Sequence, residues 1–354
     1  MHGARAMVRR GITVIAVAAV ALIVGGCPSD ELVNAATQQW HLLAAVPAGN
    51  QTQLALYRMP EGTAVSADVY AVANGAPLDG SVSMIAQFRS MLFLLQPQQQ
   101  RIEVLDAATY KRLARISTAP HAPISICFPN GTTAYTANGD STVTVVDLTT
   151  YQAVGTIRVG VAPVAIASLG NQVAVCNQRD GTVSIIDTRT NAVTHTVGVA
   201  PYPTFVAAGG SSASSFCIVS LGSGKLAQGE QPSAAMATFY NPLSQQITTQ
   251  LELSQFGQDA LGTVPRGIVA ATIAGTGIVV LDGEVQLLDL AGERLLGTVL
   301  VGSFDGGAYD FARDLLLVWA AADGGTRLIA LDPRSGTERS RALLPVVFSA
   351  AAGL

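Results

Sequence analysis

Residues 143–150 read VTVVDLTT, and residues 183–190 read VSIIDTRT. Both stretches are rich in β-branched residues and end in an aspartate followed by threonine, the pattern of a short strand that enters a tight turn. The second copy begins 40 residues after the first. A strand pattern that returns at this distance is typical of the blades of a β-propeller, so this repeat decides the fold.

Looser copies of the same phrase extend the repeat over most of the chain. Three keep the aspartate, at 102–106 (IEVLD), 285–289 (VQLLD) and 328–332 (LIALD), and two lose it, at 54–58 (LALYR) and 237–241 (ATFYN). The seven copies follow one another at intervals of 40 to 54 residues. The sequence therefore predicts an all-β fold over residues 40–354, a seven-bladed β-propeller with four-stranded antiparallel blades.

The third repeat shows the four strands of a blade most clearly. Strands are predicted at 123–128, 133–137, 142–146 and 153–159, with turns of Pro, Asn, Gly and Asp between them. The second strand ends in residues 135–138 (YTAN), and the next repeat has residues 174–177 (AVCN) at the same place. Here the chain resembles the YVTN-type β-propeller repeats, a resemblance that implies a propeller and an extracytoplasmic location but no activity.

The two ends of the chain are predicted to close the ring. Residues 40–46 match a second strand with no inner strand before them, and residues 344–350 form an apolar run that matches an inner strand. We therefore expect the C-terminal strand to join blade 1, because an open ring would leave an unpaired strand edge. Deletion of residues 345–354 should then abolish cooperative folding.

The N-terminus has the features of an export signal. Three arginines precede an apolar run at 11–24, which is short for a membrane span but right for a signal peptide. Residues 22–27 (LIVGGC) resemble a bacterial lipobox, and this resemblance implies cleavage before Cys27 and lipid on its sulfur. The predicted organisation is a signal peptide over 1–26, a lipidated tether over 27–39 and the propeller. The residue directly after Cys27 is Pro28 and not an aspartate, which, in an organism with two membranes, weakly favours the outer one.

The recurring aspartates are predicted to be structural. Each lies where a third strand enters a turn, so its carboxylate can accept hydrogen bonds from the following backbone N–H groups. A ligand role is the alternative for these residues, and their replacement should cost stability. The set comprises Asp106, Asp147, Asp187, Asp289 and Asp332.

Cysteine and histidine give little support for a metal or a disulfide framework. Beyond Cys27 the chain has Cys127, Cys176 and Cys217, an odd number without CxxC spacing. We expect buried thiols, because Cys176 and Cys217 should occupy equivalent faces of neighbouring blades. Of the histidines after the signal, only His121 is predicted near the central funnel.

The candidate binding surface is the face on which each inner strand begins. Long irregular segments at 72–80, 221–233 and 254–265 fall there, and function often resides on such loops. The candidate ligand- or partner-binding residues are His121, Tyr202, Lys225, Phe256, Asp259, Arg266 and Asp305. Degeneration of the blades without function is the alternative explanation for these segments.

Composition narrows the function without naming it. The chain after residue 26 carries 17 basic and 24 acidic side chains, a net charge of −7, with no basic stripe that would indicate nucleic-acid binding. We expect a non-catalytic cell-envelope lipoprotein without cofactor, held by lipid on Cys27 and binding another envelope protein or polymer. The alternatives are a propeller enzyme, such as a lactonase-like hydrolase or a quinoprotein-like dehydrogenase, and a surface-layer or adhesion protein.

Overall fold

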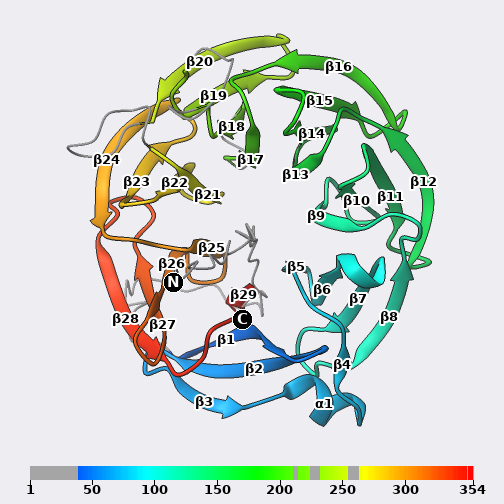
Figure 1. The fold of residues 1–354 in the computed structure, drawn as a ribbon, viewed down its shortest axis with the longest axis vertical. Coiled ribbons are helices and arrows are strands. Elements are labelled where there is room, and N and C mark those ends of the chain that lie inside the picture. The colour runs from blue at the N-terminus through cyan, green and yellow to red at the C-terminus, as the bar shows by residue number, and fades with distance from the viewer. Residues whose placement is uncertain (1–38, 210–213, 224–231, 254–262, 349, 354) are drawn as a thin grey trace, which may run out of the picture.

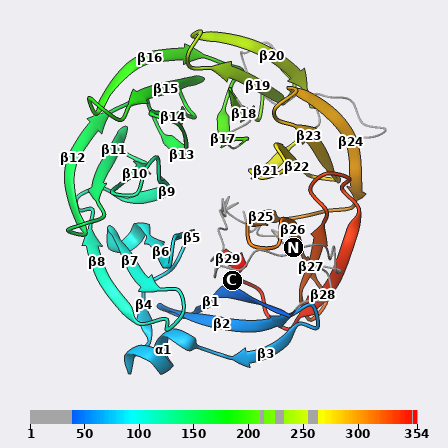
Figure 2. The same cartoon turned by 180° about the vertical axis from the view of Figure 1, so that it is seen from behind.

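The computed structural model describes residues 39–353 except 210–213, 224–231, 254–262 and 349. In this part of the chain seven antiparallel sheets stand in a ring around a central axis (Figures 1 and 2). Every sheet has an inner strand at the axis and an outer strand at the outer circumference of the disc. The predicted seven-bladed β-propeller with four-stranded blades is confirmed.

Blades 2 to 4 follow the chain from the inner strand to the outer one. Blade 2 consists of β5 (Met84–Phe88), β6 (Met91–Gln96), β7 (Arg101–Asp106) and β8 (Arg112–Ser117), with a short 3₁₀ helix at Pro97–Gln99. Blade 3 consists of β9 (Pro123–Cys127), β10 (Thr133–Asn138), β11 (Thr142–Asp147) and β12 (Gln152–Arg158). Blade 4 consists of β13 (Pro163–Leu169), β14 (Gln172–Asn177), β15 (Thr182–Asp187) and β16 (Ala192–Gly198).

Blades 5 to 7 repeat the same order. Blade 5 consists of β17 (Pro203–Ala208), β18 (Phe216–Ser220), β19 (Met236–Asn241) and β20 (Gln246–Glu252). Blade 6 consists of β21 (Pro265–Ala271), β22 (Thr276–Leu281), β23 (Glu284–Asp289) and β24 (Arg294–Val301). Blade 7 consists of β25 (Gly306–Asp310), β26 (Leu315–Ala322), β27 (Gly325–Leu331) and β28 (Glu338–Leu344).

A proline begins four of the inner strands. These residues are Pro123, Pro163, Pro203 and Pro265, and in each case the register with the second strand shifts directly after the proline. Proline has no N–H to donate, so it is tolerated where a strand has a neighbour on one side only. The inner strand is such a place, and the recurring proline marks its start.

The asparagine of the YVTN-like segment ties the second strand to the third. The amide nitrogen of Asn138 donates to the hydroxyls of Thr142 and Thr144, at 3.0 and 2.9 Å. Asn177 makes the same pair of bonds in blade 4, to Thr182 and Ser184. Both asparagines are fully buried, and each amide supplies a donor to a buried hydroxyl, Thr144 in blade 3 and Ser184 in blade 4, whereas Thr142 also bonds to Asp140.

Replacement of Asn138 by alanine is therefore expected to destabilise the protein. The buried Thr144 hydroxyl loses its donor, and the expected decrease in the free energy of unfolding is about 1–3 kcal/mol. Urea unfolding of the two chains would measure it. Asn171→Ala is the control, because Asn171 is exposed in the turn between β13 and β14, where its backbone carbonyl accepts from Thr188. An Asn138→Ala chain as stable as the unchanged protein would contradict this role.

Blade 1 departs from the regular pattern at its outer edge. Its sheet has the order β29 (Ala350–Gly353), β1 (Trp40–Ala48), β2 (Gln51–Met59) and β3 (Thr63–Ser66), and β4 (Leu78–Asp79) also pairs with β2. The helix α1 (Val69–Asn74) separates β3 from β4, and the Asp68 carboxylate caps it by accepting from the Ala71 amide. The expectation of an irregular loop at 72–80 was wrong, since this segment holds the end of α1 and β4.

Helix α1 is attached to blade 2 through a buried carboxylate. The Tyr70 hydroxyl donates to Glu103 Oε1 at 2.7 Å, and Arg115 Nε lies 2.8 Å from Glu103 Oε2. Glu103 is fully buried, and Arg115 supplies the opposite charge that such a burial requires. Burial, and then the bond to Glu103, raise the pKa of Tyr70 to about 12. The excursion between blades 1 and 2 is thus fixed to the ring.

The ring closes as predicted, but with different strand bounds. The closing strand β29 pairs antiparallel with β1, from Leu42 opposite Gly353 to Ala45 opposite Ala350. The sequence placed this strand at 344–350, whereas Leu344 ends β28. Of the residues between β28 and β29, Val347 is exposed, whereas Phe348 is buried and its ring packs edge-on against Trp319, with ring centroids 5.6 Å apart. In the part of the chain described, no helix is long and apolar enough to cross a membrane.

Candidate functional site

The five recurring aspartates accept hydrogen bonds in the turns that follow the third strands. Asp106 and Asp147 each accept from the amide and hydroxyl of the threonine that follows, at 2.6–2.8 Å. Asp187 accepts from the amide and side chain of Arg189, and Asp289 from Gly292 and Arg294. The carboxylates are thus engaged within their own blades.

Asp332 has the most extensive contacts of this set. Its carboxylate accepts from the amides of Arg334 and Ser335 and from the Arg339 guanidinium. Burial by itself would raise the pKa of Asp332, but the bonds from Arg339 and Ser335 bring it down to about 2. The aspartate is therefore ionised at any physiological pH.

Two of the predicted binding residues bond to an aspartate in the loop between the second and third strands of their blade. His121 Nδ1 lies 2.6 Å from Asp140 Oδ2, and Arg266 donates to Asp282 Oδ1 at 2.6 Å. Burial would raise the pKa of Asp140, but bonds from Thr142 and His121 hold it below its usual value. Both side chains are therefore held in place before any partner arrives.

Asp305 and Tyr202 occupy the corresponding positions in blades 7 and 5. Asp305 accepts from the Ala321 amide at 2.6 Å, and the Tyr202 carbonyl accepts from the Leu221 amide at 3.0 Å. The Tyr202 side chain is 39% exposed, and its backbone has a φ of 57°. We refer to His121, Tyr202, Arg266 and Asp305 as the rim residues.

The rim residues lie at the starts of four different inner strands, and each contacts its own blade. They form a polar border rather than one cluster of converging side chains. The candidates Lys225, Phe256 and Asp259, and also Cys27, lie outside the described residues.

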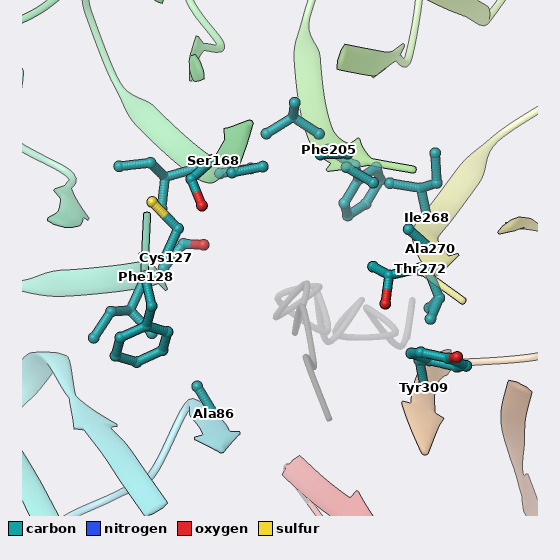
Figure 3. Close-up of a pocket in the computed structure, with 18 of the residues that line it drawn as sticks. Ala86, Cys127, Phe128, Ser168, Phe205, Ile268, Ala270, Thr272 and Tyr309 are labelled. Carbon is teal, nitrogen blue, oxygen red and sulfur yellow. The ribbon is translucent and has the colours of Figure 1, made fainter. Parts of the chain in front are cut away.

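A cavity lies along the axis of the ring, toward the C-terminal ends of the inner strands. It has a volume of about 430 Å³ and is bounded by β5, β9, β13, β17, β21 and β25 (Figure 3). In β9 the lining begins at Ser125 rather than at Pro123, and in β21 at Ile268 rather than at Pro265. Because the inner strands all run in the same direction along the axis, this cavity lies at the end of the ring away from the rim residues.

Aromatic rings form two walls of the cavity. Phe88 and Phe128 stack in parallel with centroids 4.6 Å apart, and Phe93 packs behind Phe128 at 4.8 Å. Tyr309 and Phe311 meet edge to face at 6.2 Å in blade 7. Figure 3 shows Phe128 and Tyr309 on opposite sides of the space. Small side chains such as Ala167 and Ala270 line the strands between them.

The cavity is electrically neutral. Its lining holds no aspartate, glutamate, lysine, arginine or histidine among the described residues. Burial raises the pKa of the Cys127 thiol, and burial together with the bond to Asp314 raises that of the Tyr309 hydroxyl. Neither group ionises near neutral pH, so the residues described around the cavity present no thiolate nucleophile.

One buried polar group of the lining lacks a partner. Gln87 is 3% exposed, and within the described part of the chain its Oε1 accepts no hydrogen bond. Its amide nitrogen has only a long contact, 3.5 Å to the Arg89 carbonyl. A buried carbonyl without a donor costs about 1–3 kcal/mol, and this oxygen is not exposed to the cavity space.

The three cysteines beyond Cys27 are buried and free. Cys176 packs between blades 4 and 5 and Cys217 between blades 5 and 6, so they occupy equivalent faces as predicted. In the ranges that the structure describes, no three His, Cys, Asp or Glu side chains gather to hold a metal ion.

The sequence contains one overlooked sign of the cavity. Phe88, Phe128 and Phe311 end or directly follow inner strands in three blades, so the same place in the repeat carries an aromatic ring. Alternation along a strand distinguishes the two faces of a blade, but it cannot distinguish a side chain between blades from one at the axis. These rings therefore resemble ordinary core residues in the sequence.

Comparison with known proteins supports the fold and leaves the activity open. A family model described as the cytochrome D1 heme domain matches residues 88–214, less than half of the chain. No curated protein matches. Hydrazine synthase from Kuenenia stuttgartiensis is similar with 17% identity and a TM-score of 0.53, over 69% of this chain and 73% of that one.

Two further solved structures are similar over most of their length. The computationally designed Ika8 protein has 13% identity and a TM-score of 0.57, over 86% of this chain and 87% of that one. U3-55K has 14% identity and a TM-score of 0.60, over 79% of this chain and 88% of that one. At such low identity the likeness concerns the propeller fold alone.

Proposed function

We propose that this protein is an exported, lipid-anchored propeller that binds another envelope protein or polymer and catalyses no reaction. The lipid on Cys27 would hold it at a membrane, facing the periplasm or the cell surface. The rim residues would contact the partner. The main support for this proposal is that the rim residues are already held by contacts within their own blades.

A fixed polar border favours association, because fewer side-chain conformations are lost when the partner binds. The His121–Asp140 and Arg266–Asp282 pairs supply oriented charge, and the exposed Tyr202 ring supplies an amphipathic contact. Tyrosine and arginine are enriched among the residues that dominate binding energy at protein interfaces. The rim thus has the composition of a recognition surface.

A haem-binding role, suggested by the name of the matching family model, does not fit the cavity residues. Haem iron needs an axial ligand such as histidine, thiolate, methionine or tyrosine. The described histidines lie elsewhere, Cys127 stays protonated, and Tyr309 donates to Asp314. Met84 does line the cavity, but the described lining lacks the histidine with which methionine shares the haem iron in cytochromes c. The described lining also lacks an arginine or lysine for the carboxylates of a porphyrin. We therefore derive no chemistry through haem.

The two enzyme alternatives meet similar difficulties. A metal-dependent lactonase requires carboxylates or imidazoles that converge, whereas His121 and Asp305 lie in blades 3 and 7 and contact their own blades. A quinoprotein requires a stacking tryptophan beside its cofactor, but Trp40 and Trp319 are both buried in the core around blade 1. Metal analysis with lactone and dye-reduction assays on the purified protein would test this class.

Substitution of Tyr202 and Arg266 by alanine is the direct test of the rim. We expect each change to weaken partner binding at least about tenfold, the loss that defines an important interface residue. A partner found by affinity purification from detergent-solubilised membranes would be purified and its dissociation constant measured. Val154→Ala on the outer strand β12 is the control, since Val154 is 60% exposed and far from the rim. Unchanged affinity in both rim variants would move the site elsewhere.

A further inference from the structure

The two ends of the ring, seen in Figures 1 and 2, are formed by different connections. Because the strands of a blade are antiparallel, the turns from first to second strand and from third to fourth strand lie at one end, the turn end. The loops between second and third strands lie with the rim residues at the other, the rim end. Trp40 begins β1, which runs antiparallel to the inner strand β29, so the chain enters the propeller at the turn end.

Ion pairs at the turn end direct their positive member outward. The Arg189 side chain is 70% exposed, whereas that of its partner Asp187 is 9% exposed. In blade 6 the side chains of Arg294 and Asp289 are 69% and 22% exposed. Two pairs in blade 7 share this arrangement: Arg334 with Asp314, and Arg339 with Asp332. Solvent at this end therefore meets guanidinium groups, while the carboxylates lie deeper in their turns.

At the rim end the order of charge is reversed. Asp79 at the end of β4 is 61% exposed, whereas its partner Arg101 is 12% exposed. Two more aspartates, each in a loop between second and third strands, are likewise more exposed than the basic side chains that they contact: Asp140 with His121, and Asp282 with Arg266. The propeller thus presents carboxylates at the rim end and cations at the turn end, although the chain as a whole is acidic.

Further cations and an apolar side chain lie at the turn end. Arg58 and Lys111 are exposed, and neither forms an ion pair within the residues described. Arg58 pairs with His41 beside the place where the chain enters the propeller. The turn between β19 and β20 has no charged residue, and its Leu243 is 84% exposed. Exposed cations beside an exposed leucine suit the surface of a membrane that contains anionic lipids.

We propose that the turn end rests on anionic phospholipid headgroups and that the rim end faces away from the membrane, an orientation that rests on the lipid anchor proposed above. Twelve residues separate Cys27 from Trp40, and a chain of this length spans at most about 45 Å. The anchor keeps the turn end near the bilayer, so even a weak contact is populated. The same anionic surface repels the carboxylates of the rim end, which leaves the rim residues open to a partner.

A fluorescent label at either end of the ring would measure this orientation. Leu243→Cys places a thiol at the turn end, and Val301→Cys places one at the rim end, where Val301 is 81% exposed at the end of β24. The three native thiols beyond Cys27 are buried and should stay unlabelled. The full-length protein would be incorporated into vesicles of phosphatidylcholine alone or with about a third phosphatidylglycerol, each with a nitroxide quencher on its headgroups. We expect stronger quenching at Leu243→Cys, only with phosphatidylglycerol, and its loss at high salt.

Two matched double variants, made in the Leu243→Cys chain, test the charge. Arg58→Gln with Lys111→Gln removes two cations of the turn end and breaks no ion pair among the described residues. The docking equilibrium should fall about fivefold for each cation removed. The control is Arg158→Gln with Arg179→Gln, because both arginines are exposed at the rim end and also lack an ion pair within the described residues. It changes the net charge equally and should not weaken docking.

The outcomes separate the orientation from the anchor. Quenching at Leu243→Cys that requires phosphatidylglycerol and falls without Arg58 and Lys111 would support the orientation. Equal quenching at both labels, or an equal loss in both double variants, would overturn the orientation while leaving the anchor intact. A label that reacts with Cys27 of the unchanged chain would instead refute the anchor, and the orientation with it.

Discussion

A chain that lacks residues 350–354 is expected to lose its single cooperative unfolding transition. These residues form β29, which pairs with β1 along four positions and completes blade 1 from the other end of the sequence. Ala350 and Ala351 are fully buried, so the deletion exposes the inner edge of β1 together with the apolar contacts behind it. The expected loss is on the order of 5 kcal/mol, which approaches the whole stability of many domains.

This deletion is sharper than removal of residues 345–354, because it leaves Phe348 against Trp319 and changes the closing strand alone. Calorimetry of the two chains would measure the transition. A synthetic peptide of residues 345–354 should restore part of it by adding the missing strand, and a scrambled peptide should not. A shortened chain that melts with the same midpoint and enthalpy as the full one would show that the ring does not need its closing strand.

The fold could be predicted from the sequence because each blade repeats a local pattern. In blade 3 the predicted strands at 123–128 and 142–146 differ from β9 and β11 by one residue each. The prolines, the Asn–Thr pairs and the turn aspartates all act within one blade, so their spacing along the chain suffices to place them. Because local sequence preferences and the final fold agree within each blade, the repeat can be recognised in a single sequence.

The departures occur where the ring imposes contacts that the repeat does not contain. Residues 344–350 are apolar, and the sequence interpreted them as a paired strand. In the structure Phe348 is buried against a neighbouring ring without strand pairing, and the pairing begins at Ala350. Apolar character indicates burial, but it does not distinguish packing from hydrogen bonding between strands. Helix α1 was missed for a similar reason, since six residues are too few to show a helical period.

The candidate site was predictable only in part. The rim residues His121 and Asp305 lie at the starts of inner strands as the repeat implied, but their bonds to Asp140 and Ala321 depend on loop geometry. The cavity was missed altogether, because Phe128 and Ala270 look like core residues in the sequence. The irregular loops in the sequence lie at the end of the propeller where the inner strands begin, so they give no indication of a cavity toward the other end.

The second large effect is expected from Cys27, on which the proposed membrane location depends. Replacement of Cys27 by alanine removes the thiol that would take the lipid, so the chain should move from the membrane fraction to the soluble fraction. Each methylene buried in a bilayer contributes ~0.8 kcal/mol, and two or three acyl chains hold a protein stably where a single one does not. The change would therefore remove the whole of the proposed anchor.

Fractionation after a high-salt wash would measure this distribution, and the mass of the N-terminal peptide would identify the lipid. Cys217→Ala is the matched control, because Cys217 is a buried thiol between blades 5 and 6 and its loss should leave the chain on the membrane. The chain after residue 26 has a net charge of −7, so an anionic membrane surface would repel it rather than retain it without lipid. A Cys27→Ala chain that stays with the membrane through the wash would therefore require another attachment, and an N-terminal peptide of unmodified mass would exclude the lipid itself.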